Sequence, residues 1–154
     1  MEQPIQLVNL NTIDLTQFEQ CCVGCMVLTQ DNQIMLQQRC HNWHSFPDYL
    51  AEFGGHIEAN ESPIQALQRE LNEELGAQVN PSEVISFGAL TETVSKHSIL
   101  VYEYFWHDKH GTITGCYECE ARYYDNCAAV LKHPKIMDDV RWSLNKCQKL
   151  KLLR

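Results

Sequence analysis

Residues 55–77 read GHIEANESPIQALQRELNEELGA, and this stretch decides how the chain folds. Ser62 is a favourable N-cap, Pro63 suits the first position of a helix, and Gln65 stands where it can complete a capping box. Gly76 supplies a C-terminal stop. These signals predict a helix that begins at Pro63 and ends before Gly76.

The predicted helix has an apolar stripe with an acidic face beside it. Its apolar side chains recur with helical spacing, namely Ile64, Leu67, Leu71 and Leu75. At about 100° per residue, Glu70, Glu73 and Glu74 fall in one sector next to that stripe. We therefore expect the stripe to pack on a core and the carboxylates to share the neighbouring face.

Carboxylates on one helix face repel one another, at a cost of about 0.2–0.5 kcal/mol per exposed pair. The stretch contains no lysine, and Arg69 is its only arginine. A divalent metal ion is a natural neutralising group, because carboxylate oxygens select Mg²⁺, Mn²⁺ or Ca²⁺ over softer metals. A solvated acidic surface is the alternative. The pair Gly54-Gly55 before the helix favours the metal site, because glycine lets the backbone approach an ion closely.

Written with its gaps, the stretch is Gly55, five residues, Glu61, seven residues, Arg69-Glu70-Leu71, one residue, Glu73-Glu74, one residue, Gly76 and a small apolar residue. This pattern resembles the signature of the Nudix hydrolases at every defined position, with Ala77 where the family prefers Ile, Leu or Val. One departure precedes it, since many members read Pro-Gly-Gly where this chain has Phe53-Gly54-Gly55.

The resemblance implies a site for Mg²⁺, for which Mn²⁺ can substitute. Its ligands would be carboxylates and one backbone carbonyl, namely Glu70, Glu73, Glu74 and Gly54. Arg69 and Glu61 are implied to pair and to brace the glycine loop on the helix. Glu58, in the same loop, could reach a second metal ion.

The implied reaction is hydrolysis of the pyrophosphate bond in a nucleoside diphosphate linked to a further group X. Metal ions would neutralise the phosphate charge, and a carboxylate would accept the proton of the attacking water. In MutT-like members this base is often the glutamate of the Arg-Glu pair, here Glu70, whereas in other members it lies in a later loop. Glu118 is our candidate for a later base, with Glu120 on the same face of a predicted strand. Asp138 and Asp139 are alternatives, and a surface position is the alternative for each.

Further residues near the predicted site are candidates for contacts with the substrate. Arg39 at a strand end and His56 beside the metal loop could contact phosphate, and Phe53 could stack on a base. Core packing is the alternative for Phe53, and surface contacts are the alternative for the other two. Tyr49, like Phe53, could stack on a base or pack in the core, and His41, Trp43 and His44, which precede the glycine loop, could line the pocket.

The signatures of specialised subgroups are missing after the helix. The window 90–94 reads LTETV, without the proline typical of ADP-ribose hydrolases or the tyrosine typical of diadenosine-polyphosphate hydrolases. We therefore expect a MutT-like (deoxy)nucleoside triphosphate pyrophosphohydrolase. Hydrolysis of a nucleotide sugar or another NDP-X is the first alternative, and a non-catalytic nucleotide-binding module is the second.

The whole chain, residues 1–154, is expected to form a single domain, because this length can bury a core. The net charge of −8 argues against a nucleic acid polymer as partner. We expect a cytoplasmic protein with no membrane partner, because the sequence shows neither a signal peptide nor a membrane-length apolar run. A homodimer is an option that the apolar stretch 150–153 could serve.

The eight cysteines include two C-x₂-C pairs, Cys22/Cys25 and Cys116/Cys119, which could together bind zinc. The first pair lies in a predicted strand, where residues i and i+3 point to opposite faces. Neither pair is followed by the turn residues of a zinc knuckle. We therefore expect reduced cysteines that act as small apolar residues.

Strands are predicted at 21–29, 33–39, 83–94, 97–107 and 113–124, with a hairpin turn at Gln30-Asp31-Asn32. The chain after Asp125 reads as helical, with a break near His133-Pro134. This order of elements predicts an α+β fold. The resemblance implies the Nudix fold over roughly residues 18–152, a mixed β-sheet sandwiched between α-helices in α/β/α layers.

Overall fold

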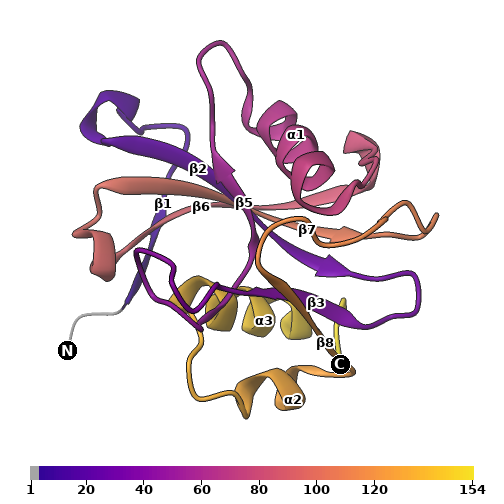
Figure 1. Cartoon of the computed structure of the whole chain (residues 1–154). Coiled ribbons are helices and arrows are strands. Elements are labelled where there is room, and N and C mark those ends of the chain that lie inside the picture. Colours follow the sequence, from indigo (N-terminus) through magenta and orange to yellow (C-terminus); the bar gives the residue numbers. More distant parts are fainter. Residues whose placement is uncertain (1–3) are drawn as a thin grey trace.

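The computed structural model describes residues 4–154, so residues 1–3 of the predicted domain lie outside the described part. A mixed β-sheet forms the centre of the molecule. Helix α1 (Pro63–Leu75) covers one face, and helices α2 (Cys127–Leu131) and α3 (Asp138–Lys149) cover the other (Figure 1). This arrangement confirms the predicted α+β fold with α/β/α layers.

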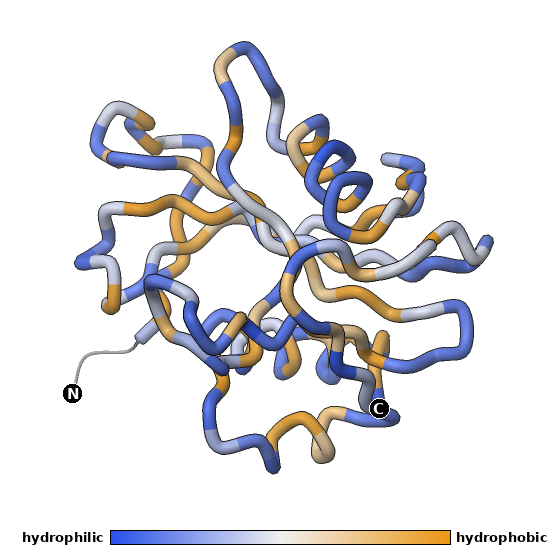
Figure 2. The backbone as a smooth tube through the Cα atoms, viewed as in Figure 1, coloured by the Kyte–Doolittle hydropathy of each residue, from blue (hydrophilic) through white to orange (hydrophobic). Residues whose placement is uncertain are grey.

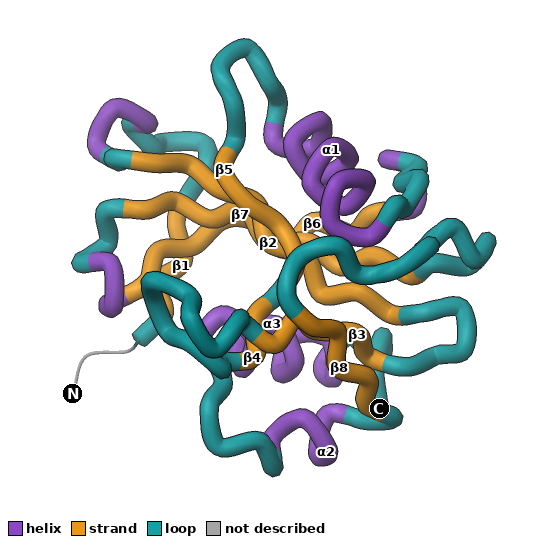
Figure 3. The backbone as a smooth tube through the Cα atoms, in the orientation of Figure 1, coloured by secondary structure: helices purple, strands orange, loops and turns teal. Residues whose placement is uncertain are grey.

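The sheet has the strand order β1-β6-β7-β2-β3-β4, while β5 pairs with β2 and β8 pairs with β3. Strands β2 and β7 run parallel, and the other named pairs are antiparallel. The strands are β1 (Ile5–Val8), β2 (Gln20–Leu28), β3 (Ile34–Gln38), β4 (Leu50–Ala51), β5 (Phe53–His56), β6 (Val84–Glu92), β7 (Ile99–His107) and β8 (Glu120–Tyr124). Short 3₁₀ turns lie at Leu15–Gln17, Pro81–Glu83 and Thr93–Ser95 (Figure 3).

The sheet separates two apolar clusters, because the side chains of β2 alternate between its faces. Val23, Cys25 and Val27 belong to the cluster under α1, whereas Met26 and Leu28 belong to the cluster under α3. Hydrophobic residues gather in the strands, while the connecting loops are mostly hydrophilic (Figure 2). Both layers of helices are therefore held on the sheet by buried apolar contacts.

Helix α1 begins and ends where the sequence predicts. The Gln65 amide donates to Ser62 Oγ at 3.2 Å, and the Ser62 amide donates to Gln65 Oε1 at 2.9 Å, which completes the capping box. Gly76 ends the helix in the left-handed conformation with φ of 67°. The leucines of the predicted stripe are fully buried, namely Leu67, Leu71 and Leu75.

The predicted strand at 113–124 is correct only in its last part, since β8 covers Glu120–Tyr124. Residues 113–119 form a loop, because their amides are used at the C-terminal end of α1. Thr114 donates to the Leu75 carbonyl at 2.9 Å, and Tyr117 donates to the Glu74 carbonyl at 2.8 Å. The expected strand face shared by Glu118 and Glu120 therefore does not exist.

The prediction that all cysteines are reduced is wrong for one pair. Cys40, which follows β3, and Cys119, which precedes β8, form a disulfide. The other six cysteines are free, and three of them are buried, namely Cys25, Cys127 and Cys147. The two bonded residues are 79 positions apart in the sequence, and the pairing of β3 with β8 brings them together.

Candidate active site

The loop before α1 is held to the helix by the Arg69 guanidinium. Arg69 contacts Glu61 through two nitrogens, with Nε to Oε2 at 2.8 Å and Nη2 to Oε1 at 3.0 Å. It also donates to the His56 carbonyl at 2.9 Å and to Glu70 Oε1 at 2.8 Å. The hydrogen bond from Arg69 lowers the pKa of Glu61. Arg69 thus joins the loop, the start of the helix and the first acid of its acidic face.

Glu74 is the most buried carboxylate on α1, with 7% of its surface exposed. Its Oε2 accepts a hydrogen bond from the Gly54 amide at 3.0 Å. Burial raises the pKa of Glu74 to about 9, against the effect of this hydrogen bond. Gly54 has φ of 147°, and a Cβ there would collide with the Val23 carbonyl oxygen. Only glycine therefore brings this amide to the carboxylate.

Glu70 lies beside Gly55, where an added Cβ would come within 2.6 Å of Glu70 Oε1. Burial raises the pKa of Glu70, and the neighbouring Arg69 opposes that rise. Glu73 is different, since 59% of its side chain is exposed and its Oε2 lies 3.4 Å from Arg69 Nη1. We call Glu70 and Glu74 the α1 carboxylates, because they are the two that turn toward the sheet.

Of the later acids, Glu118 is the one that faces the α1 carboxylates. Its negative charge adds to the effect of burial in raising the pKa of both Glu70 and Glu74. Glu120 lies 3.2 Å from Arg122 in an ion pair, with 62% of its side chain exposed. The loop conformation of residues 113–119 thus separates two acids that the sequence left as alternatives.

A cleft of about 970 Å³ runs from these acids across the sheet. Glu70, Glu74 and Glu118 are among the residues that line it. Arg39, Glu52 and Asp139 line the cleft as well, together with Trp43, His44, Ser45 and Phe46 from the loop after β3. A smaller hollow of about 390 Å³ lies near the C-terminus and contains none of these acids.

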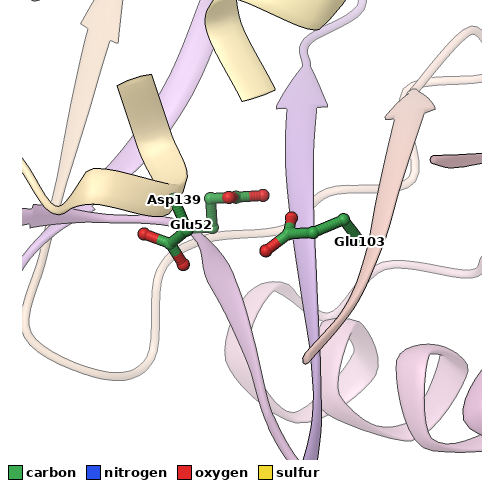
Figure 4. Close-up of side chains that lie close together, drawn as sticks. All are labelled: Glu52, Glu103 and Asp139. Atoms are coloured by element: carbon green, nitrogen blue, oxygen red, sulfur yellow. The ribbon is translucent and has the colours of Figure 1, made fainter. Parts of the chain in front are cut away.

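A second acidic group lies under α3 (Figure 4), and we call its members, Glu52, Glu103 and Asp139, the buried acid trio. Their carboxylate oxygens lie within 4.8 Å of one another. Ser143 Oγ lies 3.1 Å from Glu52 Oε1 and 3.2 Å from Glu103 Oε2. Burial raises the pKa of Glu52 and Glu103 well above the ordinary value, and raises that of Asp139 to about 6.

Gly24 makes room for this trio in the middle of the sheet. It lies opposite Glu103 on β7 and opposite Gly54 on β5. A Cβ at Gly24 would come within 3.2 Å of Glu103 Oε1. One oxygen of Glu103 and one of Glu52 are buried without a hydrogen-bond partner. The trio therefore contains buried acceptor oxygens that lack a donor.

The NUDIX domain family model matches residues 20–141 of this chain. The chain belongs to the Nudix family. It is 32% identical over 121 residues to the CTP pyrophosphohydrolase of Escherichia coli (strain K12), a match that covers 77% of this chain and 84% of that protein. It is 38% identical over 66 residues to the m7GpppN-mRNA hydrolase NUDT17 of Danio rerio, which covers 42% of this chain and only 22% of that longer protein.

Solved Nudix structures have the same fold. The MutT protein of Methanosarcina mazei superimposes with a TM-score of 0.67 at 15% identity, covering 90% of this chain and 99% of the other. The ORF135 protein of E. coli superimposes with a TM-score of 0.62 at 23% identity, covering 90% and 95%. Because the chain belongs to the Nudix family and is similar to a CTP pyrophosphohydrolase over most of both chains, it is a hydrolase that acts on pyrophosphate bonds.

The predicted substrate residues of this Nudix domain are all among the residues that line the cleft, although the side chain of Phe53 is fully buried. Arg39 and His56 line it, and Arg39 Nη1 is held by the carbonyl and hydroxyl oxygens of Ser45, each at 3.2 Å. Phe53 cannot stack on a base, because its side chain is fully buried in the cluster under α1. The alternative of core packing holds for it, and Tyr49 packs against the opposite cluster.

His41 lies outside the cleft lining and pairs with Asp48 at 2.9 Å, while Trp43 and His44 line the cleft. Asp139, an alternative for the base, lies with Glu52 and Glu103. Sequence analysis missed these last two acids as site residues. Glu103 had a signal, since it is the single acid in the otherwise apolar and aromatic strand ILVYEYFWH.

None of the helices in residues 4–154 has the length and apolarity needed to cross a membrane. The cytoplasmic location and the homodimer stay predictions from the sequence.

Proposed function

We propose that this Nudix hydrolase is a divalent-metal-dependent nucleoside triphosphate pyrophosphohydrolase, with Mg²⁺ as the metal, which converts a nucleoside triphosphate to the monophosphate and pyrophosphate. The observation that carries the proposal is that Glu70, Glu74 and Glu118 all line one cleft, where the charge of Glu118 acts on both of the other two. The rest of the cleft has room and polar groups for the remainder of a nucleotide.

The α1 carboxylates fit a hard cation. They lie on one face of α1, and their pKa values are raised by burial and by the charges of neighbouring carboxylates, among them Glu73 and Glu118. Arg69 is already shared with Glu61 and the His56 carbonyl. Glu70 and Glu74 would hold the ion, assisted by Glu73 and the Gly54 carbonyl. When bound, such an ion neutralises phosphate charge and lowers the pKa of bound water.

The side chains of this chain supply the remaining chemistry. Glu118 faces the reacting end of the cleft and would accept the proton of the attacking water, with Glu70 as the alternative base. Arg39, fixed by Ser45, would hold the phosphate chain through its guanidinium. Glu73, more exposed than its neighbours, would contribute mainly to the charge of the metal site.

The part of the cleft lined by Glu52 and Asp139 would suit a nucleobase that carries an amino group. Glu52 and Asp139 line it with carboxyl oxygens, and Glu52 Oε2 lacks a partner. The exocyclic amino group of cytosine would supply hydrogen-bond donors to such oxygens. Similarity to a CTP pyrophosphohydrolase over most of both chains supports cytidine triphosphates as the first substrates to test.

A second candidate is hydrolysis of a different NDP-X, such as a nucleotide sugar or a capped 5′ end. The local similarity to NUDT17 favours it, although the match spans less than half of this chain. Open cleft walls around Trp43 and His44 would leave space for a larger group X.

One assay separates these functions. Nucleotide products are separated by chromatography, and pyrophosphate release is measured alongside, during a Mg²⁺ titration with CTP, dCTP, the other nucleoside triphosphates, a nucleotide sugar, a cap dinucleotide and ADP-ribose. We expect Mg²⁺-dependent formation of CMP and pyrophosphate, and loss of it in Glu70→Gln. A preference for the cap or the sugar nucleotide would favour the second candidate. Nucleotide binding without turnover of any compound would contradict both.

A further inference from the structure

The disulfide joins two loops that line the cleft. Cys40 directly follows Arg39, and Cys119 directly follows Glu118. Both bonded cysteines are partly exposed, so a small reductant can reach them. A single covalent bond thus connects the neighbour of the proposed phosphate-binding arginine to the neighbour of the proposed base.

On its N-terminal side, the segment with Glu118 is fixed at the end of α1. The amide of Tyr117 donates to the Glu74 carbonyl at 2.8 Å. On its C-terminal side, regular pairing with β3 begins at Glu120. Glu118 and Cys119 span the gap between these two anchors. The Glu118 carbonyl accepts hydrogen bonds from Gln37 Nε2 at 3.0 Å and Cys116 Sγ at 3.4 Å.

The backbone conformation of Cys119 depends on its contacts with other parts of the chain. Its φ of 56° is left-handed, which a residue with a side chain adopts only when its surroundings impose it. The disulfide to Cys40 is such a constraint, and the Cys40 amide lies 3.0 Å from Cys119 Sγ. Release of the bond would remove the strongest constraint on the residue beside Glu118.

The start of the loop after β3, which contains Cys40, is held in place by backbone hydrogen bonds. The Arg39 amide donates to the Tyr49 carbonyl at 2.9 Å, and the Asp48 amide donates to the Arg39 carbonyl at 3.1 Å, which closes the neck of the loop. The disulfide therefore attaches a loop without regular structure to a well-anchored point on β3 and its loop.

We propose that the Cys40–Cys119 disulfide is a redox-sensitive positioning element that holds Glu118 toward the α1 carboxylates. A dithiol reductant supplies two electrons and two protons, the sulfur–sulfur bond breaks, and both cysteines become thiols while the reductant becomes its own disulfide. The segment around Glu118 then loosens and turnover falls. This inference rests on the proposed function, since it gives Glu118 the part of base.

Cys116 is the nearby thiol that could exchange with this bond. Burial raises the pKa of Cys116, which lowers its thiolate fraction and slows its attack on the disulfide. Direct reduction by an external dithiol is therefore the route by which the positioning is lost.

The first test compares kinetics of the oxidised protein and the dithiothreitol-reduced protein on its best substrate. We expect reduction to lower kcat by about tenfold and to leave KM within about twofold, because misplacement of a reacting group affects turnover more than binding. Cys40→Ser should have the lower kcat in both conditions. The matched control Cys21→Ser should respond as the wild type does. In Glu118→Gln, reduction should have no further effect.

A second readout is independent of turnover. Alkylation and mass measurement count the free thiols, and hydrogen exchange follows residues 113–119 in both redox states. We expect six free thiols in the oxidised protein, as in the structure, and faster exchange of this segment after reduction. Eight free thiols under oxidising conditions, or exchange and kcat both unaffected by reduction, would overturn the inference. If no compound is hydrolysed in either state, the proposed function fails, and the exchange data alone decide the positioning.

Discussion

The α1 carboxylates and the buried acid trio have the same functional groups, yet their surroundings differ. Glu70 contacts the Arg69 guanidinium and Glu74 contacts the Gly54 amide. Glu52 and Glu103 instead share one serine hydroxyl, and each keeps an unpaired oxygen. A guanidinium or a backbone amide donates to each acid of the first group, whereas Glu52 and Glu103 share a hydroxyl donor and burial raises their pKa well above the ordinary value.

The solvent exposure and the neighbouring donors of a carboxylate therefore decide what it can do in this molecule. An acid partly open to solvent and next to a glycine loop can bind a metal ion. An acid under a helix, in contact with another acid, holds a proton and offers hydrogen bonds to neutral groups. We therefore propose that the reaction takes place at the α1 carboxylates and that the acids under α3 help to recognise the rest of the nucleotide.

The largest expected effect comes from Glu74→Gln. Loss of a buried negative charge beside Glu70 should lower kcat by about 10³, because metal-assisted hydrolysis depends on the ligands of the ion. Pyrophosphate release under saturating CTP measures it. Glu73→Gln, at the exposed position, is the matched control and should lower kcat far less. Equal losses in both variants would break the distinction between buried and exposed acids on α1.

The next effect separates the two later acids. Glu118→Gln should lower kcat by about 10², the typical contribution of a general base. Glu120→Gln, which removes only an exposed ion pair with Arg122, should stay within about twofold of wild type. Initial rates across pH 6 to 9 measure both. A large loss of kcat in Glu120→Gln alone would identify Glu120, and not Glu118, as the general base.

Arg69→Met should lower the free energy of unfolding and not only the rate of the reaction. The substitution leaves Glu61, Glu70 and the His56 carbonyl without their shared donor, so we expect a loss of about 2 kcal/mol in the free energy of unfolding. Urea denaturation without metal measures it. Arg122→Met, which loses a more exposed pair, should cost much less. Similar losses in the two variants would argue against a bracing role for Arg69.

A last effect concerns pH and the buried acid trio. Burial raises the pKa of Glu103 in the folded state above its ordinary 4.5, so the unfolded chain loses this proton first as pH rises. Stability therefore falls with rising pH above about 4.5, by up to about 1.4 kcal/mol per pH unit for each such proton. Glu103→Gln should flatten this decline. Denaturation midpoints at pH 5, 6, 7 and 8, with Glu120→Gln as control, measure it, and an unchanged slope would contradict protonation of Glu103.

Sequence analysis predicted the elements whose signals are local. The caps and leucine stripe define α1, and the turn Gln30-Asp31-Asn32 between two apolar runs defines the hairpin of β2 and β3. The Glu61–Arg69 contact followed from the family pattern, although no sequence rule gives its two-nitrogen geometry. The strand at 113–124 failed because its amides are satisfied by carbonyls at the end of α1, a contact between distant segments.

The remaining features depend on long-range pairing. The disulfide and the trio each join residues that the sheet brings together, as in the register of Gly24 with Gly54 and Glu103. Phe53 looked like a ligand contact because it adjoins the glycine loop, but strand alternation turns it toward α1. A lone acid within an apolar strand, such as Glu103, is the signal that deserved more weight.

Mn²⁺ binding, measured by electron paramagnetic resonance without nucleotide, tests the central claim most directly. The experiment compares wild type, Glu74→Gln and Glu103→Gln, with folding verified by circular dichroism. We predict that Glu74→Gln weakens Mn²⁺ binding by at least about tenfold, while Glu103→Gln binds as the wild type does. Loss of binding in Glu103→Gln with retention in Glu74→Gln would place the metal at the buried acid trio and contradict the account.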